Sequence, residues 1–477
     1  MNGAPGRPRT LLLNLPYKVR LVRRYMCSYQ SPNILFPPVE LLALGGIVRH
    51  WKQGAVDLLD AVAESCDLDA VSRRIREFRP DIIVTFTGFA CLDDDAAAIR
   101  EIKRRHPQVN LVLFGYYPTL FPRDFLDQLP IDFIILGEPD LTFSALYDRL
   151  ADGGNLAEVN AIAYRGADGL PLVQGEAQRV RDPDSLPRPA YELLRIEGYS
   201  EPFFPRPYAA IQSARGCPFG CTFCVRSYGR KLTTRSPETV LDEIRFLKER
   251  FHIRAFRFTD DTFTAVKDRV LKLCRLMVEA GLGLKWSCLS RADTLDEEIL
   301  GSMWEAGCRR LYVGIESGSQ RTLDRYNKGT NAAAVLQKLL LCKKHGMETM
   351  GFFTIGMPGE TREDFEQTIE LALRAKLDYY GGTELIAYPG TDLFTQLKDQ
   401  VEFSLFPYTN RFKDREFEAR QRRWKKEFYR RFYFRPSVVM KFAGRALSHP
   451  RDVFGGTAKL GRFLLSGPPP AKRDEMF

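Results

Sequence analysis

Two blocks of this chain alternate short apolar runs with amphipathic stretches, and this alternation restricts the fold more than any other sequence feature. The apolar runs of the first block are Thr10–Leu15, Ala55–Leu59, Asp81–Phe86, Asn110–Phe114 and Asp132–Leu136. The helical patterns between them are Val39–His50, Leu68–Phe78 and Asp94–His106, with another after Leu141. Strands that are buried on both faces and alternate with helices indicate a doubly wound, Rossmann-like parallel sheet. We therefore expect an α/β domain over residues 1–150.

The second block, residues 206–400, repeats this alternation. Its expected strands are Ala209–Ser213, Ala255–Thr259, Leu284–Ser290, Arg310–Ile315, Thr349–Ile355 and Gly382–Ala387. Its helical patterns are Pro237–Phe251, Ala265–Ala280, Asp296–Glu305, Asn331–His345 and Arg362–Ala375. Six strands with intervening helices predict a partial (β/α)6 barrel, shorter than the eightfold type. A hairpin at Ala161–Val173 and a proline-rich linker, together residues 151–205, are expected to join the two domains.

The net charge of +10 is confined to the C-terminal region. Residues 401–477 contain 18 Lys and Arg but only 8 Asp and Glu, so residues 1–400 are balanced, which argues against nucleic acid as a partner. Aromatic residues interleave with cations and place an apolar face on a predicted helix. Three interpretations of this tail stay open: it packs on the barrel, it lies on an anionic membrane, or it contacts RNA. The later segment Val438–Leu465 supports the first two.

The N-terminus lacks the apolar core of a signal peptide, and no stretch reaches about 18 apolar residues. We therefore expect a cytoplasmic protein, and the tail adds peripheral contact with the inner membrane face as an option. Ten cysteines fit a reducing compartment. Seven of them are scattered and are predicted to be core thiols, with Cys288 the one worth testing for a role: Cys27, Cys66, Cys91, Cys274, Cys288, Cys308 and Cys342.

The remaining three cysteines, Cys217, Cys221 and Cys224, lie within eight residues in the spacing C-x3-C-x2-C. They follow the first expected strand of the second block, so their loop lies at the end of the barrel where such enzymes carry their chemistry. Structural zinc has four protein ligands, and no further Cys or His follows before His252. Three thiolates suit a cubane iron–sulfur cluster with one iron open to substrate or cofactor.

This cysteine motif, with an aromatic residue before its last cysteine, resembles that of the radical S-adenosylmethionine (radical SAM) enzymes. The resemblance implies a 4Fe–4S cluster on Cys217, Cys221 and Cys224, with Phe223 shielding it and SAM chelating the open iron. It also implies reductive cleavage of SAM to methionine and a 5′-deoxyadenosyl radical, which removes a hydrogen atom from the substrate. An electron donor of the flavodoxin or ferredoxin type is then expected.

Further matches end the later strands of the second block. The resemblance implies that SAM contacts Asp260, Asp261, Arg291, Glu316, Gly356 and Pro358. The two aspartates stand where the family has a Gly-Gly-Glu-like segment for the SAM amino group, Arg291 is assigned to the carboxylate and Glu316 to the ribose. Strand alternation directs Glu316 to the same face as Gly314, a costly position without a partner. The alternatives are capping roles for the carboxylates and a solvated position for Arg291.

The first domain, placed ahead of these motifs, resembles that of the cobalamin-binding radical SAM enzymes. The resemblance implies cobalamin contacts from Thr87, Gly88, Gly115, Thr119, Gly137 and Glu138. Glycine permits close approach of the backbone to a large planar ligand, and threonine supplies hydroxyls. The family's turns are degraded but in register, because Tyr116 and Tyr117 replace a Gly and a His. No Asp-x-His-x-x-Gly motif occurs, so the cobalamin is expected to lack a His ligand. Ordinary turn chemistry is the alternative.

The function expected from this resemblance is methylation of an unactivated carbon or phosphorus centre of a small-molecule or lipid-like substrate. A cobalamin-dependent cyclase, oxidase or ring-rearranging enzyme is the first alternative. A tRNA methylthiotransferase is less consistent with the sequence, since only Cys27, Cys66 and Cys91 could bind its second cluster. A non-catalytic redox sensor is the last alternative. The sequence identifies neither the substrate nor any catalytic residue.

Overall fold

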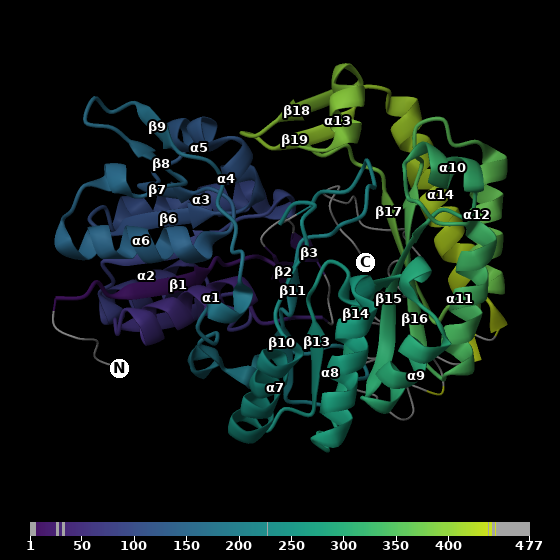
Figure 1. Cartoon of the computed structure of the whole chain (residues 1–477). Coiled ribbons are helices and arrows are strands. Elements are labelled where there is room, and N and C mark those ends of the chain that lie inside the picture. The colour runs from purple at the N-terminus through teal and green to yellow at the C-terminus, as the bar shows by residue number, and fades with distance from the viewer. Residues whose placement is uncertain are drawn as a thin grey trace. The chain divides into compact units, whose positions relative to one another are not determined.

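The computed structural model describes residues 6–24, 28–30, 34–226, 228–436, 438–440 and 444, and the chain forms two compact units (Figure 1). The first unit comprises Met1–Tyr199 and Ser404–Thr409, and the second comprises Ser200–Phe403 and Asn410–Phe477. The predictions for Cys27 and for most of Val438–Leu465 fall outside the described residues.

The first unit is a doubly wound α/β fold with the strand order β4-β1-β5-β6-β7-β8-β9. Five strands are parallel: β1 (Thr10–Asn14), β4 (Val56–Asp60), β5 (Ile82–Phe86), β6 (Asn110–Phe114) and β7 (Phe133–Ile135). All five predicted strands are confirmed within one residue at each end. Every residue of β1 and β5 is buried, which explains their mostly apolar sequences.

The predicted hairpin of the linker extends this sheet as antiparallel β8 (Ile162–Arg165) and β9 (Pro171–Gln174). A separate hairpin pairs β2 (Leu21–Arg23) with β3 (Ser28–Gln30). The helices of the first unit are α1 (Val39–Gly46), α2 (Leu68–Phe78), α3 (Leu92–Arg105), α4 (Tyr116–Leu120), α5 (Pro122–Gln128) and α6 (Pro139–Asp152).

The second unit contains six parallel strands in consecutive order, with β10 and β17 at the edges, as in a partial barrel. These strands are β10 (Tyr208–Ile211), β13 (Ala255–Phe258), β14 (Lys285–Arg291), β15 (Cys308–Glu316), β16 (Glu348–Ile355) and β17 (Tyr379–Glu384). The predicted bounds of the last strand were wrong, because it begins at Tyr379 rather than at Gly382. The short pairs β11 (Ala214–Arg215) with β12 (Thr233–Thr234) and β18 (Val401–Ser404) with β19 (Thr409–Phe412) stand outside this sheet.

Helices connect the strands of the second unit as predicted. They are α7 (Pro237–Phe251), α8 (Lys267–Glu279), α9 (Glu297–Glu305), α10 (Gln320–Arg325), α11 (Ala332–Lys344), α12 (Arg362–Arg374), α13 (Asp392–Leu397) and α14 (Arg415–Tyr433). The Ser236 hydroxyl accepts a bond from the Thr239 amide at 3.2 Å and caps α7. Thr361 caps α12 in the same way, in a reciprocal arrangement with Asp364.

The basic helix α14 packs its apolar face on the second unit, beside α12 and β17 (Figure 1). Trp424, Phe428 and Phe432 are buried. The Trp424 ring stacks on Phe365 of α12 at 4.7 Å between centroids, and the Phe428 ring lies 4.3 Å from that of Tyr380 in β17. The first interpretation of the tail, packing on the barrel, is therefore confirmed for Arg415–Tyr433.

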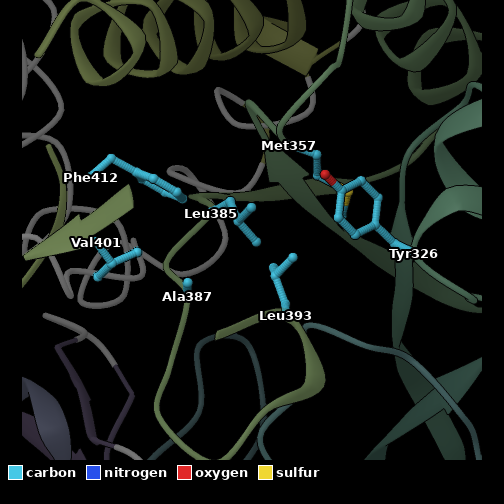
Figure 2. Packing of buried hydrophobic residues seen from close by; sticks show 7 residues of the cluster. All are labelled: Tyr326, Met357, Leu385, Ala387, Leu393, Val401 and Phe412. Carbon is cyan, nitrogen blue, oxygen red and sulfur yellow. The ribbon is translucent and has the colours of Figure 1, made fainter. Parts of the chain in front are cut away.

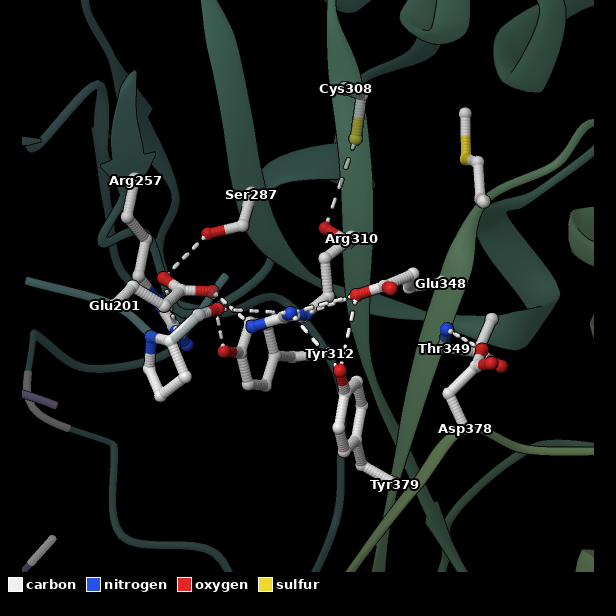
Figure 3. A network of polar contacts seen from close by, with 12 residues as sticks. Glu201, Arg257, Ser287, Cys308, Arg310, Tyr312, Glu348, Thr349, Asp378 and Tyr379 are labelled. Atoms are coloured by element: carbon white, nitrogen blue, oxygen red, sulfur yellow. Dashed lines mark hydrogen bonds and ion pairs between the residues drawn. The ribbon is translucent and has the colours of Figure 1, made fainter. Parts of the chain in front are cut away.

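A buried polar network occupies the amino-terminal part of the second sheet (Figure 3). Its centre is the Glu201 carboxylate, which accepts hydrogen bonds from the Tyr312 hydroxyl at 2.6 Å, the Ser287 hydroxyl at 2.9 Å and the Arg310 guanidinium at 3.1 Å. Arg310 continues to Glu348 at 2.7 Å. The network ties the linker residue Glu201 to strands β14, β15 and β16.

None of the described helices combines the length and the hydrophobicity needed to cross a bilayer. Five of the scattered cysteines are buried, as predicted for core thiols: Cys91, Cys274, Cys288, Cys308 and Cys342. Cys66 is only partly buried. Burial raises the pKa of the Cys288 thiol well above its ordinary value, which makes it an inert core group.

Candidate active site

The three clustered cysteines lie in a loop that the fold fastens at its base. β11 and β12 pair on either side of this loop, and the Cys217 amide donates to the Gly229 carbonyl at 3.1 Å. Gly216 has φ +88°, and a Cβ at this position would lie 2.3 Å from the Lys231 carbonyl oxygen. Only glycine fits this close approach, so the turn before Cys217 depends on it.

The three thiols influence one another electrostatically. Burial raises the pKa of the Cys224 thiol, and the neighbouring Cys221, Cys217 and Asp261 raise it further. Three thiolates in one region need a positive centre to offset their charge. Within the described part of the chain, no three His, Cys, Asp or Glu side chains converge tightly enough to hold a single metal ion.

The two adjacent aspartates after β13 have different surroundings. Asp260 is 1% exposed, and one of its oxygens accepts bonds from the amides of Ser213 at 2.7 Å and Ala214 at 2.9 Å. The other oxygen accepts a bond from the Ser213 hydroxyl. Asp260 therefore holds the chain between β10 and the cysteine loop. Of the two aspartates, Asp261 is the one whose charge raises the pKa of the Cys224 thiol.

The inward-facing Glu316 has the partner that its position requires. One carboxylate oxygen accepts a bond from the Lys328 ammonium at 3.0 Å, and the other accepts one from the Thr354 hydroxyl at 2.8 Å. A Cβ on Gly314 would lie 3.0 Å from Glu316 and 3.1 Å from the Lys328 nitrogen, so the glycine leaves room for the ion pair. Lys328 is only 5% exposed. Lys328 was not among the residues predicted from the sequence.

The turn after β16 is held from two sides. The Glu360 carboxylate accepts bonds from the amides of Gly356 at 2.7 Å and Met357 at 3.0 Å. Gln421 of α14 donates to the Gly356 carbonyl at 2.9 Å. Burial raises the pKa of Glu360 to about 7. A residue of the basic tail thus helps to shape the turn that contains Gly356 and Pro358, both of which were predicted to contact SAM.

Apolar side chains gather beside this turn (Figure 2). The buried members are Tyr326, Met357, Leu385, Ala387, Leu393, Val401 and Phe412. The Tyr326 hydroxyl donates to the Pro358 carbonyl at 2.7 Å. Phe223 of the cysteine loop packs against this cluster and is partly buried. The predicted shielding residue is therefore anchored next to the turn that contains Gly356 and Pro358.

The predicted cobalamin residues gather at the carboxyl ends of β5, β6 and β7, which are neighbours in the first sheet. The Thr119 hydroxyl donates to the Gly115 carbonyl at 2.8 Å and accepts from the Gly137 amide at 3.1 Å, so it links the last two turns. After the end of β5, the Thr87 hydroxyl donates a hydrogen bond to the Asp95 carboxylate at 2.7 Å, and Gly88 is the next residue. Glu138 accepts from the Val180 amide at 3.2 Å.

One polar atom at this edge has no partner in the described part of the chain. Thr85 is fully buried, and its hydroxyl makes no hydrogen bond there. A buried hydroxyl without a partner is costly unless a ligand satisfies it. Thr85 lies inside β5 and its hydroxyl is inaccessible, so the glycine turns are the part of this edge that suits a bound group.

Known proteins resemble this chain over both units. A model of the radical SAM superfamily matches residues 211–372. An uncharacterised methyltransferase of Pyrococcus horikoshii is 32% identical over 361 residues, which are 75% of this chain and 78% of the relative. The anaerobic magnesium-protoporphyrin IX monomethyl ester cyclase of Rubrivivax gelatinosus is 27% identical over 374 residues, which are 77% of this chain and 67% of the cyclase.

A solved structure has the same fold over nearly the whole chain. The cobalamin-dependent S-adenosylmethionine radical enzyme OxsB, with aqua-cobalamin and S-adenosylmethionine bound, gives a TM-score of 0.72 at 17% identity. The match covers 97% of this chain and 74% of OxsB.

Proposed function

Because the chain belongs to the radical SAM enzymes, we propose that it is a cobalamin-dependent member that methylates an unactivated carbon or phosphorus centre of a small-molecule or lipid-like substrate. The observation that carries this proposal is the loop of three thiols at the carboxyl end of a parallel sheet, in a chain similar to a methyltransferase over 75% of its length. A flavodoxin or ferredoxin would supply electrons. Ten cysteines favour a cytoplasmic location.

Cys217, Cys221 and Cys224 would hold a 4Fe–4S cluster, which would supply the electron for SAM cleavage, and bound cobalamin would supply the methyl group. The protein's own contribution is placement. The thiol loop is fastened by Gly216 and, through the strand before it, by Asp260. The groups assigned to SAM around this loop are Asp261, Glu316, Lys328 and the turn that contains Gly356 and Pro358.

The charged groups of the site suit the polar ends of SAM. The Asp261 carboxylate near the thiols is suited to accept hydrogen bonds from the amino group. Lys328 donates one bond to Glu316, and its ammonium can donate two more, which suits a carboxylate. Glu316 is placed to accept the ribose hydroxyls. The turn with Gly356 and Pro358, beside Phe223, offers backbone and apolar surface to adenine.

In the first unit, we assign cobalamin to the edge formed by the carboxyl ends of β5, β6 and β7. Gly88 and Gly115 permit the corrin or its nucleotide tail to approach the backbone, whereas Gly137 packs against the backbone of Gln178. Thr87, Thr119 and Glu138 make bonds within the protein and therefore maintain the shape of the turns.

A second candidate is a cyclase that uses the same cofactors without methyl transfer, and the 27% identity to the Rubrivivax gelatinosus enzyme favours it. The protein reconstituted anaerobically with iron and sulfide, with and without cobalamin, would be incubated with SAM and a reductant. S-adenosylhomocysteine that forms only with cobalamin supports methyl transfer. Formation of 5′-deoxyadenosine alone contradicts methyl transfer and supports the cyclase. The absence of both products contradicts the proposed chemistry altogether.

The tail adds a proposed contact with an anionic membrane surface. Arg423, Lys426 and Arg430 are exposed and follow helical spacing on the outer face of α14, and the exposed Phe434 and Met440 follow them. Cations beside exposed apolar groups favour anionic lipid, at about 1 kcal/mol per cation. Sedimentation with phosphatidylserine vesicles should therefore fall strongly in the R423E/K426E/R430E variant. Equal sedimentation of the variant and the wild type would contradict this contact.

A further inference from the structure

Arg291, at the end of β14, is bound on every side by the protein. Its side chain is buried, and its Nε and one Nη donate to the two Asp293 oxygens at 3.0 Å and 2.9 Å. The same Nη donates to the Lys328 carbonyl at 2.6 Å. The other Nη donates to the Cys221 sulfur at 3.4 Å. The guanidinium carbon lies 3.8 Å from the centroid of the Phe219 ring.

These contacts leave Arg291 little capacity for a ligand. A guanidinium has five N–H groups, and the four bonds above use four of them. A SAM carboxylate would find only one N–H group, unless it displaced the bonds to Asp293 and to Lys328. The role assigned to Arg291 from the sequence, pairing with that carboxylate, is therefore poorly matched to its surroundings.

The contact with Cys221 suggests a different role. Hydrogen bonds to cluster sulfurs and nearby charge are among the factors that set the reduction potential of an iron–sulfur cluster. A buried cation that donates to a thiolate ligand stabilises the form of the cluster with the additional electron, because that form is more negative. We propose that Arg291 is a positioning residue that raises the reduction potential of the cluster through Cys221 and does not bind SAM directly. This inference rests on the proposed cluster site.

Replacing Asp293 should shift the reduction potential in the direction opposite to that expected for replacing Arg291. Its carboxylate pairs with Arg291 and offsets part of the positive charge that Cys221 experiences. Removing the carboxylate charge in Asp293→Asn should therefore raise the reduction potential, whereas Arg291→Gln should lower it. An arginine that only anchored SAM would leave the potential of the SAM-free protein unchanged in Arg291→Gln.

The test is a potentiometric titration, followed by electron paramagnetic resonance, of the reconstituted full-length protein without SAM. We expect the midpoint potential of the cluster in Arg291→Gln to be about 59 mV more negative than in the wild type. For a one-electron couple, this shift reduces the ratio of reduced to oxidised cluster about tenfold at a given solution potential. The Asp293→Asn midpoint should move the other way. The SAM dissociation constant of Arg291→Gln should change less than about threefold. Arg309→Gln is the matched control: Arg309 lies 4.0 Å over Trp304, near the opposite end of the sheet.

An unchanged midpoint in Arg291→Gln, with full iron content, overturns the proposal. Weaker SAM binding with an unchanged midpoint also overturns it, in favour of the carboxylate role. If Arg291→Gln holds no cluster, Asp293→Asn decides: a more positive midpoint supports the proposal and an unchanged midpoint overturns it. A wild-type protein that binds no cluster would instead refute the proposed function itself.

Discussion

Gln421 connects the C-terminal helix to the turn that we assign to the SAM adenine, and its replacement tests whether α14 belongs to the active site. The side chain is 1% exposed, and its amide nitrogen lies 2.9 Å from the Gly356 carbonyl oxygen and 3.3 Å from that of Leu385. A Cβ on Gly356 would lie 2.3 Å from the Gln421 Cγ, so the two segments are in close contact. The informative change is Gln421→Met, which keeps the length of the side chain and removes the donor.

The expected loss of stability follows from the two carbonyl groups that would lose their donor. A buried acceptor without a partner costs about 1–3 kcal/mol. The bond at 3.3 Å is long and contributes less than the one at 2.9 Å. Methionine fills the space with little packing cost. We therefore expect the free energy of unfolding of the second unit to fall by about 2–4 kcal/mol, a large share of the 5–15 kcal/mol typical of a domain.

The effect on SAM binding has a separate origin. Fixing the backbone of one residue costs about 1–2 kcal/mol, and SAM would have to supply this for a loosened Gly356 turn. The dissociation constant for SAM should therefore rise about 5- to 30-fold. Urea denaturation measures the stability and calorimetry measures the SAM affinity. The exposed neighbour Arg422 provides the control Arg422→Met, which should stay within about 0.5 kcal/mol of the wild type. If Gln421→Met equals the wild type in stability and in SAM affinity, α14 covers the edge of the sheet and does not belong to the active site.

Three further outcomes are expected. Glu201→Gln should lower the free energy of unfolding by about 3–5 kcal/mol, because it removes the carboxylate that faces the buried Arg310, and urea denaturation checks this (Figure 3). The pKa of Glu360 is raised from 4.5 to about 7, so its contribution to stability is complete below pH 4.5 and is lost as the pH rises to 7. Glu360→Gln should abolish this loss of about 3 kcal/mol, and an unchanged pH profile of stability would refute the reasoning. Cys221→Ala should lose the visible absorbance of the cluster, whereas Cys288→Ala, which removes a buried core thiol, should keep it. Retained absorbance in Cys221→Ala would remove that residue from the site.

The strands could be predicted because parallel strands that are buried on both faces are rich in apolar residues. β5, Ile82–Phe86, is buried throughout and stands out as an apolar run. The same criterion misplaced β17. The apolar residues Leu385 and Ala387 were assigned to this strand, but they belong to the cluster beside the Gly356 turn (Figure 2). The strand itself begins with Tyr379, whose hydroxyl contacts Glu348. An apolar residue shows that a position is buried, but not which surface buries it.

The site was predictable only where one short segment contains the chemistry. The three cysteines are such a segment. Asp260 and Asp261 are adjacent and chemically identical, and only the burial of Asp260 against Ser213 separates a positioning role from a ligand role. Lys328 and Gln421 could not be predicted from a short segment. Each is a single polar residue whose partner comes from another part of the chain, Glu316 for the lysine and Gly356 for the glutamine, and nothing in the local sequence indicates that pairing.

The position of α14 follows from the incompleteness of the barrel. A sheet of six parallel strands leaves β17 with an unpaired edge, and exposed edges invite association with other chains. Here the Tyr433 hydroxyl accepts from the Tyr380 amide and donates to the Tyr380 carbonyl, both at 3.1 Å, so one side chain replaces a pair of strand hydrogen bonds. Gln421, three turns earlier on the same helix, reaches the Gly356 turn at the carboxyl end of the sheet. Since one helix both covers the edge and supports the turn, its apolar face is committed to the second unit, and only its basic outer face is available to a partner.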